Sequence, residues 1–103
     1  MFRRRRFREV IDRQLGFFEQ DDADLLDDVN HAFEKYDRAD RDEAEELYGD
    51  YQLAIEAATD RLAELRDTYA RTLDEADAEG YVREFNETVV RRWRELALTI
   101  EES

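Results

Sequence analysis

Apolar side chains recur along this chain in three series with alternating steps of three and four residues. The first series is Ile11, Leu15, Phe18, Leu25, Val29, Ala32 and Tyr36, with Asp22 as its one polar position. The second is Ala44, Tyr48, Tyr51, Ile55, Ala58, Leu62, Leu65, Tyr69 and Ala76, interrupted at Thr72. The third is Val82, Phe85, Val89, Trp93, Leu96 and Ile100. Because this spacing keeps one stripe of a helix facing a neighbouring helix, it predicts an all-α fold of long packed helices.

Capping residues and one glycine mark the helix boundaries. Asp40 followed by Glu43 forms a capping-box pattern, which predicts a helix start at residue 41. The acidic segment that ends at Gly80 predicts a turn at about 78–81, because glycine is common just past a helix end. The alternative without this turn is one helix of roughly 60 residues that packs between molecules. We expect helices over about 4–37, 41–78 and 82–101.

The first of these segments leaves two interpretations open. The apolar spacing continues across Asp22, which favours one continuous but kinked helix. Alternatively, the helix stops near Gln20, and Asp21 caps a second helix with Asp24 reaching back to the cap amide. Asp22 is therefore the position where we expect a kink, a break or a buried functional carboxylate.

Helix lengths predict the architecture. Two helices of about 50 Å joined by a short loop make a long antiparallel hairpin, and a third helix of ~20 residues covers only part of it. The expected fold is thus a three-helix, coiled-coil-like bundle, in which half of the hairpin either stays two-stranded or is covered by dimerisation. Phe7, Phe17 and Phe33 lie outside the apolar series and exceed what a two-helix seam needs, and Phe17 and its neighbour Phe18 are candidate binding residues. Trp93 is a further candidate, although its place in the third apolar series favours the core.

Composition agrees with a helical protein and limits its class. The 103 residues include no proline and three glycines, so helix breakers are rare, and the length fits one domain over 1–103. With no cysteine, disulfide and thiolate chemistry are excluded. No apolar run approaches the ~20 residues of a membrane span, and the arginine-rich start lacks the apolar stretch of a secretory signal. We expect a cytoplasmic location.

Charge is distributed unevenly. The chain has 29 acidic and 16 basic residues, and the simplest interpretation of this excess is a solvated surface. Residues 1–20 carry six arginines and three acids, whereas residues 21–46 carry twelve acids and three bases. The basic arm over 1–6 contains Arg3, Arg4, Arg5 and Arg6, which suit an acidic protein partner, nucleic acid or an anionic membrane. Because the rest of the chain is acidic, nucleic acid and membrane are the disfavoured partners.

Catalytic and metal-binding patterns are scarce. Asp28 and His31 lie on one helix face, as in ferritin-like carboxylate–histidine bundles, but one such pair favours a solvated histidine over a metal ligand. Ser103 is the only serine, and there is no glycine-rich phosphate loop. We therefore expect no enzyme and no cofactor. The favoured function is a non-enzymatic helical interaction protein that forms a homodimer or binds another protein; an oligomeric metal-binding bundle and an Arg3–Arg6 nucleic-acid or membrane binder are the alternatives.

Overall fold

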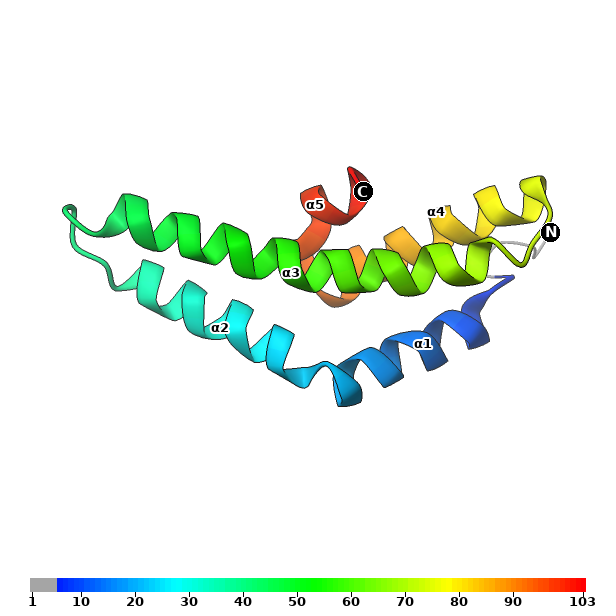
Figure 1. Cartoon of the computed structure of the whole chain (residues 1–103), viewed down its shortest axis with the longest axis horizontal. Coiled ribbons are helices and arrows are strands. Elements are labelled where there is room, and N and C mark those ends of the chain that lie inside the picture. The colour runs from blue at the N-terminus through cyan, green and yellow to red at the C-terminus, as the bar shows by residue number, and fades with distance from the viewer. Residues whose placement is uncertain (1–5) are drawn as a thin grey trace.

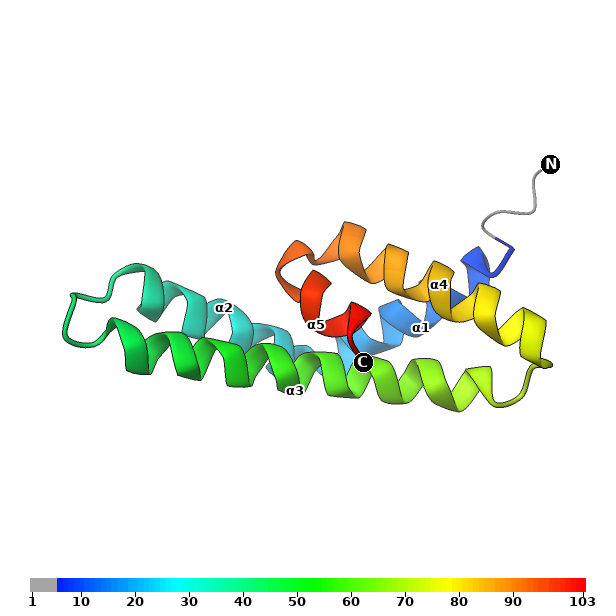
Figure 2. The same ribbon diagram turned by 90° about the horizontal axis from the view of Figure 1, so that it is seen from above.

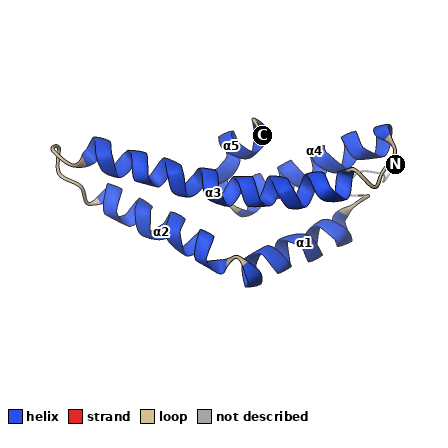
Figure 3. Cartoon of the chain, viewed as in Figure 1, coloured by secondary structure: helices blue, strands red, loops and turns tan. Residues whose placement is uncertain are grey.

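The computed structural model describes residues 6–103, and every regular element in this range is a helix (Figure 3). The elements are α1 (Arg8–Asp21), α2 (Ala23–Asp37), α3 (Ala44–Ala70), α4 (Glu75–Arg92), the short 3₁₀ helix η1 (Arg94–Leu96) and α5 (Ala97–Glu101). The prediction of an all-α chain is confirmed. None of the helices in the described range combines the length and the apolar character that crossing a bilayer requires.

Helices α1 and α2 follow one side of α3 and meet at an angle at Asp22 (Figure 1). The backbone of Asp22 leaves the helical region, with φ −118° and ψ 32°. Its carboxylate Oδ2 accepts a hydrogen bond from Arg61 Nε of α3 at 3.1 Å. The favoured continuous helix over 4–37 is therefore corrected to two helices. Aspartate is a weak helix former, and here its side chain bonds to α3 without capping α2.

The turn between α3 and α4 lies earlier in the chain than the glycine predicted. Helix α3 ends at Ala70 instead of residue 78, and Gly80 lies inside α4. Asp74 caps the start of α4, because its Oδ1 accepts a hydrogen bond from the backbone N–H of Asp77 at 2.8 Å. Acidic residues in the first turn also favour this start through the helix dipole. The predicted turn at 78–81 is corrected to residues 71–74.

The start of α3 is also shifted from its predicted position. Asp40 Oδ1 does accept a hydrogen bond from the backbone N–H of Glu43, at 3.2 Å, as the capping pattern predicts. Residues 41–43 nevertheless form a turn, and the helix begins at Ala44 instead of residue 41.

The C-terminal segment reverses direction at Trp93 (Figure 2). Trp93 has φ −136° and ψ 87°, so α4 stops there, and η1 and α5 run back along the molecule. The single helix predicted over 82–101 is thereby corrected to α4, η1 and α5. The reversal buries Leu96 and Ile100 completely against α3 and α4, and burial of two such side chains is worth about 3–6 kcal/mol.

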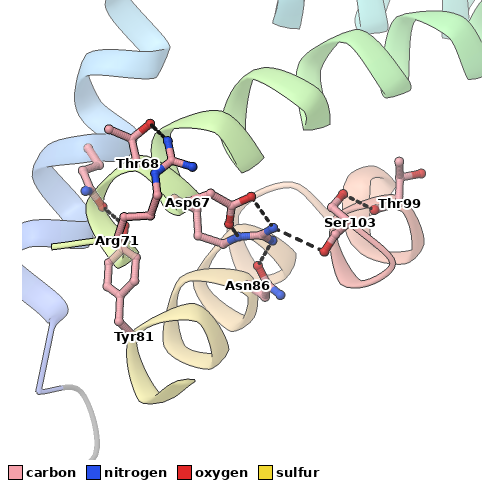
Figure 4. A network of polar contacts seen from close by, with 9 residues as sticks. Asp67, Thr68, Arg71, Tyr81, Asn86, Thr99 and Ser103 are labelled. Atoms are coloured by element: carbon pink, nitrogen blue, oxygen red, sulfur yellow. Dashed lines mark hydrogen bonds and ion pairs between the residues drawn. The ribbon is translucent and has the colours of Figure 1, made fainter. Parts of the chain in front are cut away.

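A buried arginine ties this returning segment to the rest of the fold (Figure 4). Arg66 of α3 is only 3% exposed. Its guanidinium donates to Asp67 Oδ1 at 2.8 Å, Asn86 Oδ1 at 3.0 Å and the carbonyl oxygen of Ser103 at 3.3 Å. A buried charge persists in a fold only when its donors are satisfied, so these bonds hold α4 and the residues after α5 against α3.

The core divides the molecule into two regions. Its buried apolar residues are Ile11, Leu15, Phe18, Val29, Ile55, Ala58, Leu62, Tyr81, Phe85, Val89, Leu96 and Ile100. Only Val29 belongs to residues 23–54, which we call the distal hairpin: α2, the loop after it and the first part of α3. The remaining described residues form the packed half, where α1, the second part of α3, α4 and α5 meet (Figures 1 and 2).

Candidate functional site

Four aromatic side chains lie together on the distal hairpin. Phe33 and Tyr36 come from α2, and Tyr48 and Tyr51 come from α3. Ring centroids are 5.5 Å apart for Phe33 and Tyr51, 5.2 Å for Tyr36 and Tyr48, and 6.3 Å for the stacked pair Tyr36 and Tyr51. Phe33 is 46% exposed and Tyr48 is 44% exposed. We call these four residues the aromatic face.

The aromatic face lies beyond the part of α3 that α4 packs against. Helix α4 packs on the second part of α3, and the chain turns back at Trp93 before it reaches the end of the hairpin (Figure 2). Tyr51 lies close enough to η1 for the negative charge of Glu95 to act on it. Burial raises the pKa of Tyr51, and the charge of Glu95 raises this pKa further. Beyond this point, Phe33 and Tyr48 leave nearly half of their surface exposed.

The distal hairpin is also the most acidic part of the chain. Residues 23–54 contain eleven aspartates and glutamates against three basic residues, Lys35, Arg38 and Arg41. A surface with this charge repels a copy of itself and attracts a basic surface. The aromatic face is therefore an apolar patch with an acidic surround.

Arginines gather between the start of α1 and helix α4, along the packed half of the molecule. Arg6, Arg8, Arg83, Arg91 and Arg92, which we call the arginine groove, line two adjoining hollows of about 510 and 250 Å³. Acidic residues of the groove are partly engaged: Asp77 pairs with Arg6 at 2.6 Å, and Glu84 accepts a hydrogen bond from the Phe7 N–H. Within residues 6–103, Arg83 and Arg91 form no ion pair.

The candidate residues from the sequence fall into different environments. Arg3, Arg4 and Arg5 lie outside the described residues, and Arg6 is part of the arginine groove. Phe17 is 56% exposed on α1. Phe18, in contrast, is fully buried and packs edge-on against the half-buried Trp93, with ring centroids 5.5 Å apart. In this conformation Phe18 and Trp93 hold α1 against the end of α4 and offer little surface to a partner.

Asp28 and His31 line a shallow hollow on the distal hairpin together with Lys35 and Asp50. Across the described range, no three His, Cys, Asp or Glu side chains lie close enough to hold a metal ion. The carboxylate of Asp22 is engaged by Arg61, and its hydrogen bond raises the pKa of that guanidinium, with Glu64 adding to the effect. Asp22 therefore joins α3 to the bend between α1 and α2.

The sequence had assigned three members of the aromatic face to the seam between helices. Tyr36, Tyr48 and Tyr51 fit the three–four spacing, which does not distinguish a covered stripe from an uncovered one. The sequence feature that indicates an uncovered stripe is the length of the predicted third helix, which is too short to cover the whole hairpin. In comparisons with known proteins, no family model, no curated protein and no solved structure matches the chain.

Proposed function

We propose that this chain is a non-enzymatic helical interaction protein that self-associates through its distal hairpin. The observation that carries the proposal is the aromatic face, a group of four rings of which two are nearly half exposed. Exposed aromatic clusters with a polar surround are typical of protein–protein interfaces, because tyrosine and phenylalanine bury a large area on binding. The proposed setting is the cytoplasm.

Self-association would complete the helical layers of the hairpin. Two helices alone, α2 and α3, bury one apolar seam and leave the neighbouring face to solvent. A partner helix on that face would give the hairpin the three-helix, coiled-coil-like packing that we propose for the assembled molecule. The interaction role explains the aromatic face, whereas no contact among the described residues specifically supports the metal-binding, nucleic-acid or membrane alternatives.

Sedimentation velocity over a range of protein concentrations tests this proposal. The wild-type chain is expected to form a dimer, and a Phe33→Gln/Tyr48→Gln variant is expected to dissociate at least about tenfold more readily, because it loses two apolar contacts without a change in charge. The matched control is Leu53→Gln. Leu53 is 64% exposed on α3, two residues from Tyr51 and therefore on nearly the opposite side of that helix.

The control separates a specific interface from general stickiness. If Leu53→Gln weakens the dimer as much as the double variant does, the aromatic face has no special role. A wild-type chain that remains monomeric at the highest concentration measured would contradict self-association altogether. Circular dichroism should report the same helix content for all three proteins, since the substituted side chains are all exposed.

A further inference from the structure

We infer that the aromatic face also binds a basic amphipathic helix of another protein. This partner is distinct from the second copy of the proposed self-association, and its binding does not require that the chain dimerises. Both partners would use the same exposed rings, so they would compete for one surface. The surface lies on the distal hairpin, past the point where α4 ends (Figure 2).

The side of α3 that meets α4 continues onto the distal hairpin. Tyr48, Thr59 and Arg66 follow one another at steps of eleven and seven residues, which keep them on one side of the helix. Thr59 and Arg66 are buried, and Arg66 donates to Asn86 of α4 at 3.0 Å, whereas Tyr48 is 44% exposed. From Ala44 to residue 54 this side of α3 is about 16 Å long, or three helical turns. A helix of similar length placed here would continue the layer that α4 forms in the packed half.

Carboxylates of the distal hairpin have no ion-pair partner within residues 6–103. Every ion pair in this range joins residues outside 23–54. In the packed half, for example, Arg92 pairs with both Asp12 and Glu19. The hairpin nevertheless carries eleven acidic residues against three basic ones. This uncompensated negative charge attracts a cationic partner and repels polyanions such as nucleic acid and anionic membranes.

Exposed rings beside these carboxylates favour a partner that is apolar as well as basic. Phe33 and Tyr48 come from different helices, so they border the shallow groove between α2 and α3 from both sides. By helix spacing, Asp37 lies one turn from Phe33, and Glu45 lies one turn from Tyr48. A guanidinium can stack on an aromatic ring and pair with a carboxylate next to it. A helix with an apolar stripe flanked by arginines therefore matches both features, as in other helix-in-groove contacts.

Fluorescence anisotropy with two labelled synthetic peptides tests the contact on the full chain. The first is a helical peptide of about 16 residues made of leucine, alanine and arginine, with leucines at three–four spacing and arginines beside them. The second has glutamate in place of every arginine. The chain should bind the arginine peptide at least about tenfold more tightly at low salt, and added salt should reduce this difference.

Matched carboxylate variants separate a defined contact from attraction by overall charge. Asp37→Asn with Glu45→Gln removes two carboxylates beside the rings and should weaken binding of the arginine peptide about fivefold or more. Asp60→Asn with Glu79→Gln removes the same charge at exposed positions outside the distal hairpin, and it should change the affinity less than about twofold.

The ring variant tests the apolar part of the contact. Phe33→Gln with Tyr48→Gln keeps the net charge and should weaken binding of the arginine peptide about tenfold, because both ring contacts are lost. The arginine peptide should also dissociate the wild-type dimer, since both bind the same face. A dimer that binds the peptide without dissociating would place the peptide elsewhere and overturn the inference.

Further outcomes distinguish this inference from the proposed function. Equal affinity for the two peptides overturns the basic helix as partner, and so does equal weakening by the two carboxylate variants, because binding would then follow net charge alone. Both results leave self-association through the aromatic face intact. A chain that binds the arginine peptide but stays monomeric at every concentration contradicts self-association and leaves the basic helix as partner.

Discussion

Helix α3 runs through both regions of the molecule and meets a different environment in each. In the packed half it contacts α4, η1 and α5, and Ala58, Thr59 and Leu62 are completely buried. In the distal hairpin the same helix contacts α2, and Tyr48 is 44% and Leu53 64% exposed. The buried apolar core is therefore concentrated in one half, while the other half exposes apolar and acidic residues to solvent.

The largest expected effect compares one phenylalanine from each region. Phe85 is fully buried in the packed half, whereas Phe33 is 46% exposed on the distal hairpin. Phe85→Ala should lower the free energy of unfolding by about 3–5 kcal/mol, because it removes a buried ring and leaves a cavity. Phe33→Ala should cost at most about 1 kcal/mol. Urea denaturation at a protein concentration too low for dimerisation measures both, and similar costs would contradict the division into two regions.

Alkaline pH should weaken the packed half through Tyr81. Burial raises the pKa of Tyr81 to about 12, so the folded state holds the hydroxyl proton more tightly than the unfolded chain does. The stabilisation from this proton is complete below pH ~10, the pKa of an exposed tyrosine, and is lost as pH rises to about 12. The loss should be on the order of 2 kcal/mol, and thermal unfolding between pH 8 and pH 12 measures it.

Tyr81→Phe is the control for that pH dependence. It keeps the ring that contacts Phe7, Tyr69 and Phe85 but removes the titrating hydroxyl and its 2.7 Å hydrogen bond to Gln14. The variant should be about 1 kcal/mol less stable at neutral pH and should lose less stability on going to pH 12. If the variant lost as much stability at pH 12 as the wild type does, the pH dependence would come from groups other than Tyr81.

The apolar spacing predicted helix and burial well, but it did not predict where helices end. Phe85, Val89 and Ile100 are buried as their series indicates, because burial follows from which face of a helix is apolar. The spacing continues unbroken through Trp93, so it carried no sign of the reversal there. That reversal depends on contacts with distant residues, among them those of Arg66 and the burial of Leu96 and Ile100, which a local pattern does not contain.

The turn between α3 and α4 shows a second limit. The expected turn at Gly80 excluded Tyr81 from the core, although Tyr81, Phe85 and Val89 follow one another at helical spacing. Thr72, the gap in the second apolar series, lies in the observed turn between α3 and α4. For the candidate site, the short third helix indicated that part of the hairpin is uncovered. The sequence does not identify which aromatic rings are exposed, because their exposure depends on where α4 ends.

The smallest expected effect asks whether the two regions unfold together. Gly49 lies in α3 within the distal hairpin, and a methyl group added there would meet open space. Gly49→Ala should therefore stabilise the local helix by about 0.5–1 kcal/mol, since glycine is the weaker helix former.

The hairpin has little core of its own, so we expect it to open without the packed half. Native-state hydrogen exchange should then slow about two- to fivefold for backbone amides of the distal hairpin and stay unchanged for those of α4, which is protected by the core. Equal slowing in both regions would instead mean that the packed half and the distal hairpin open as one cooperative unit, and the contrast between them would then concern surface and charge but not stability.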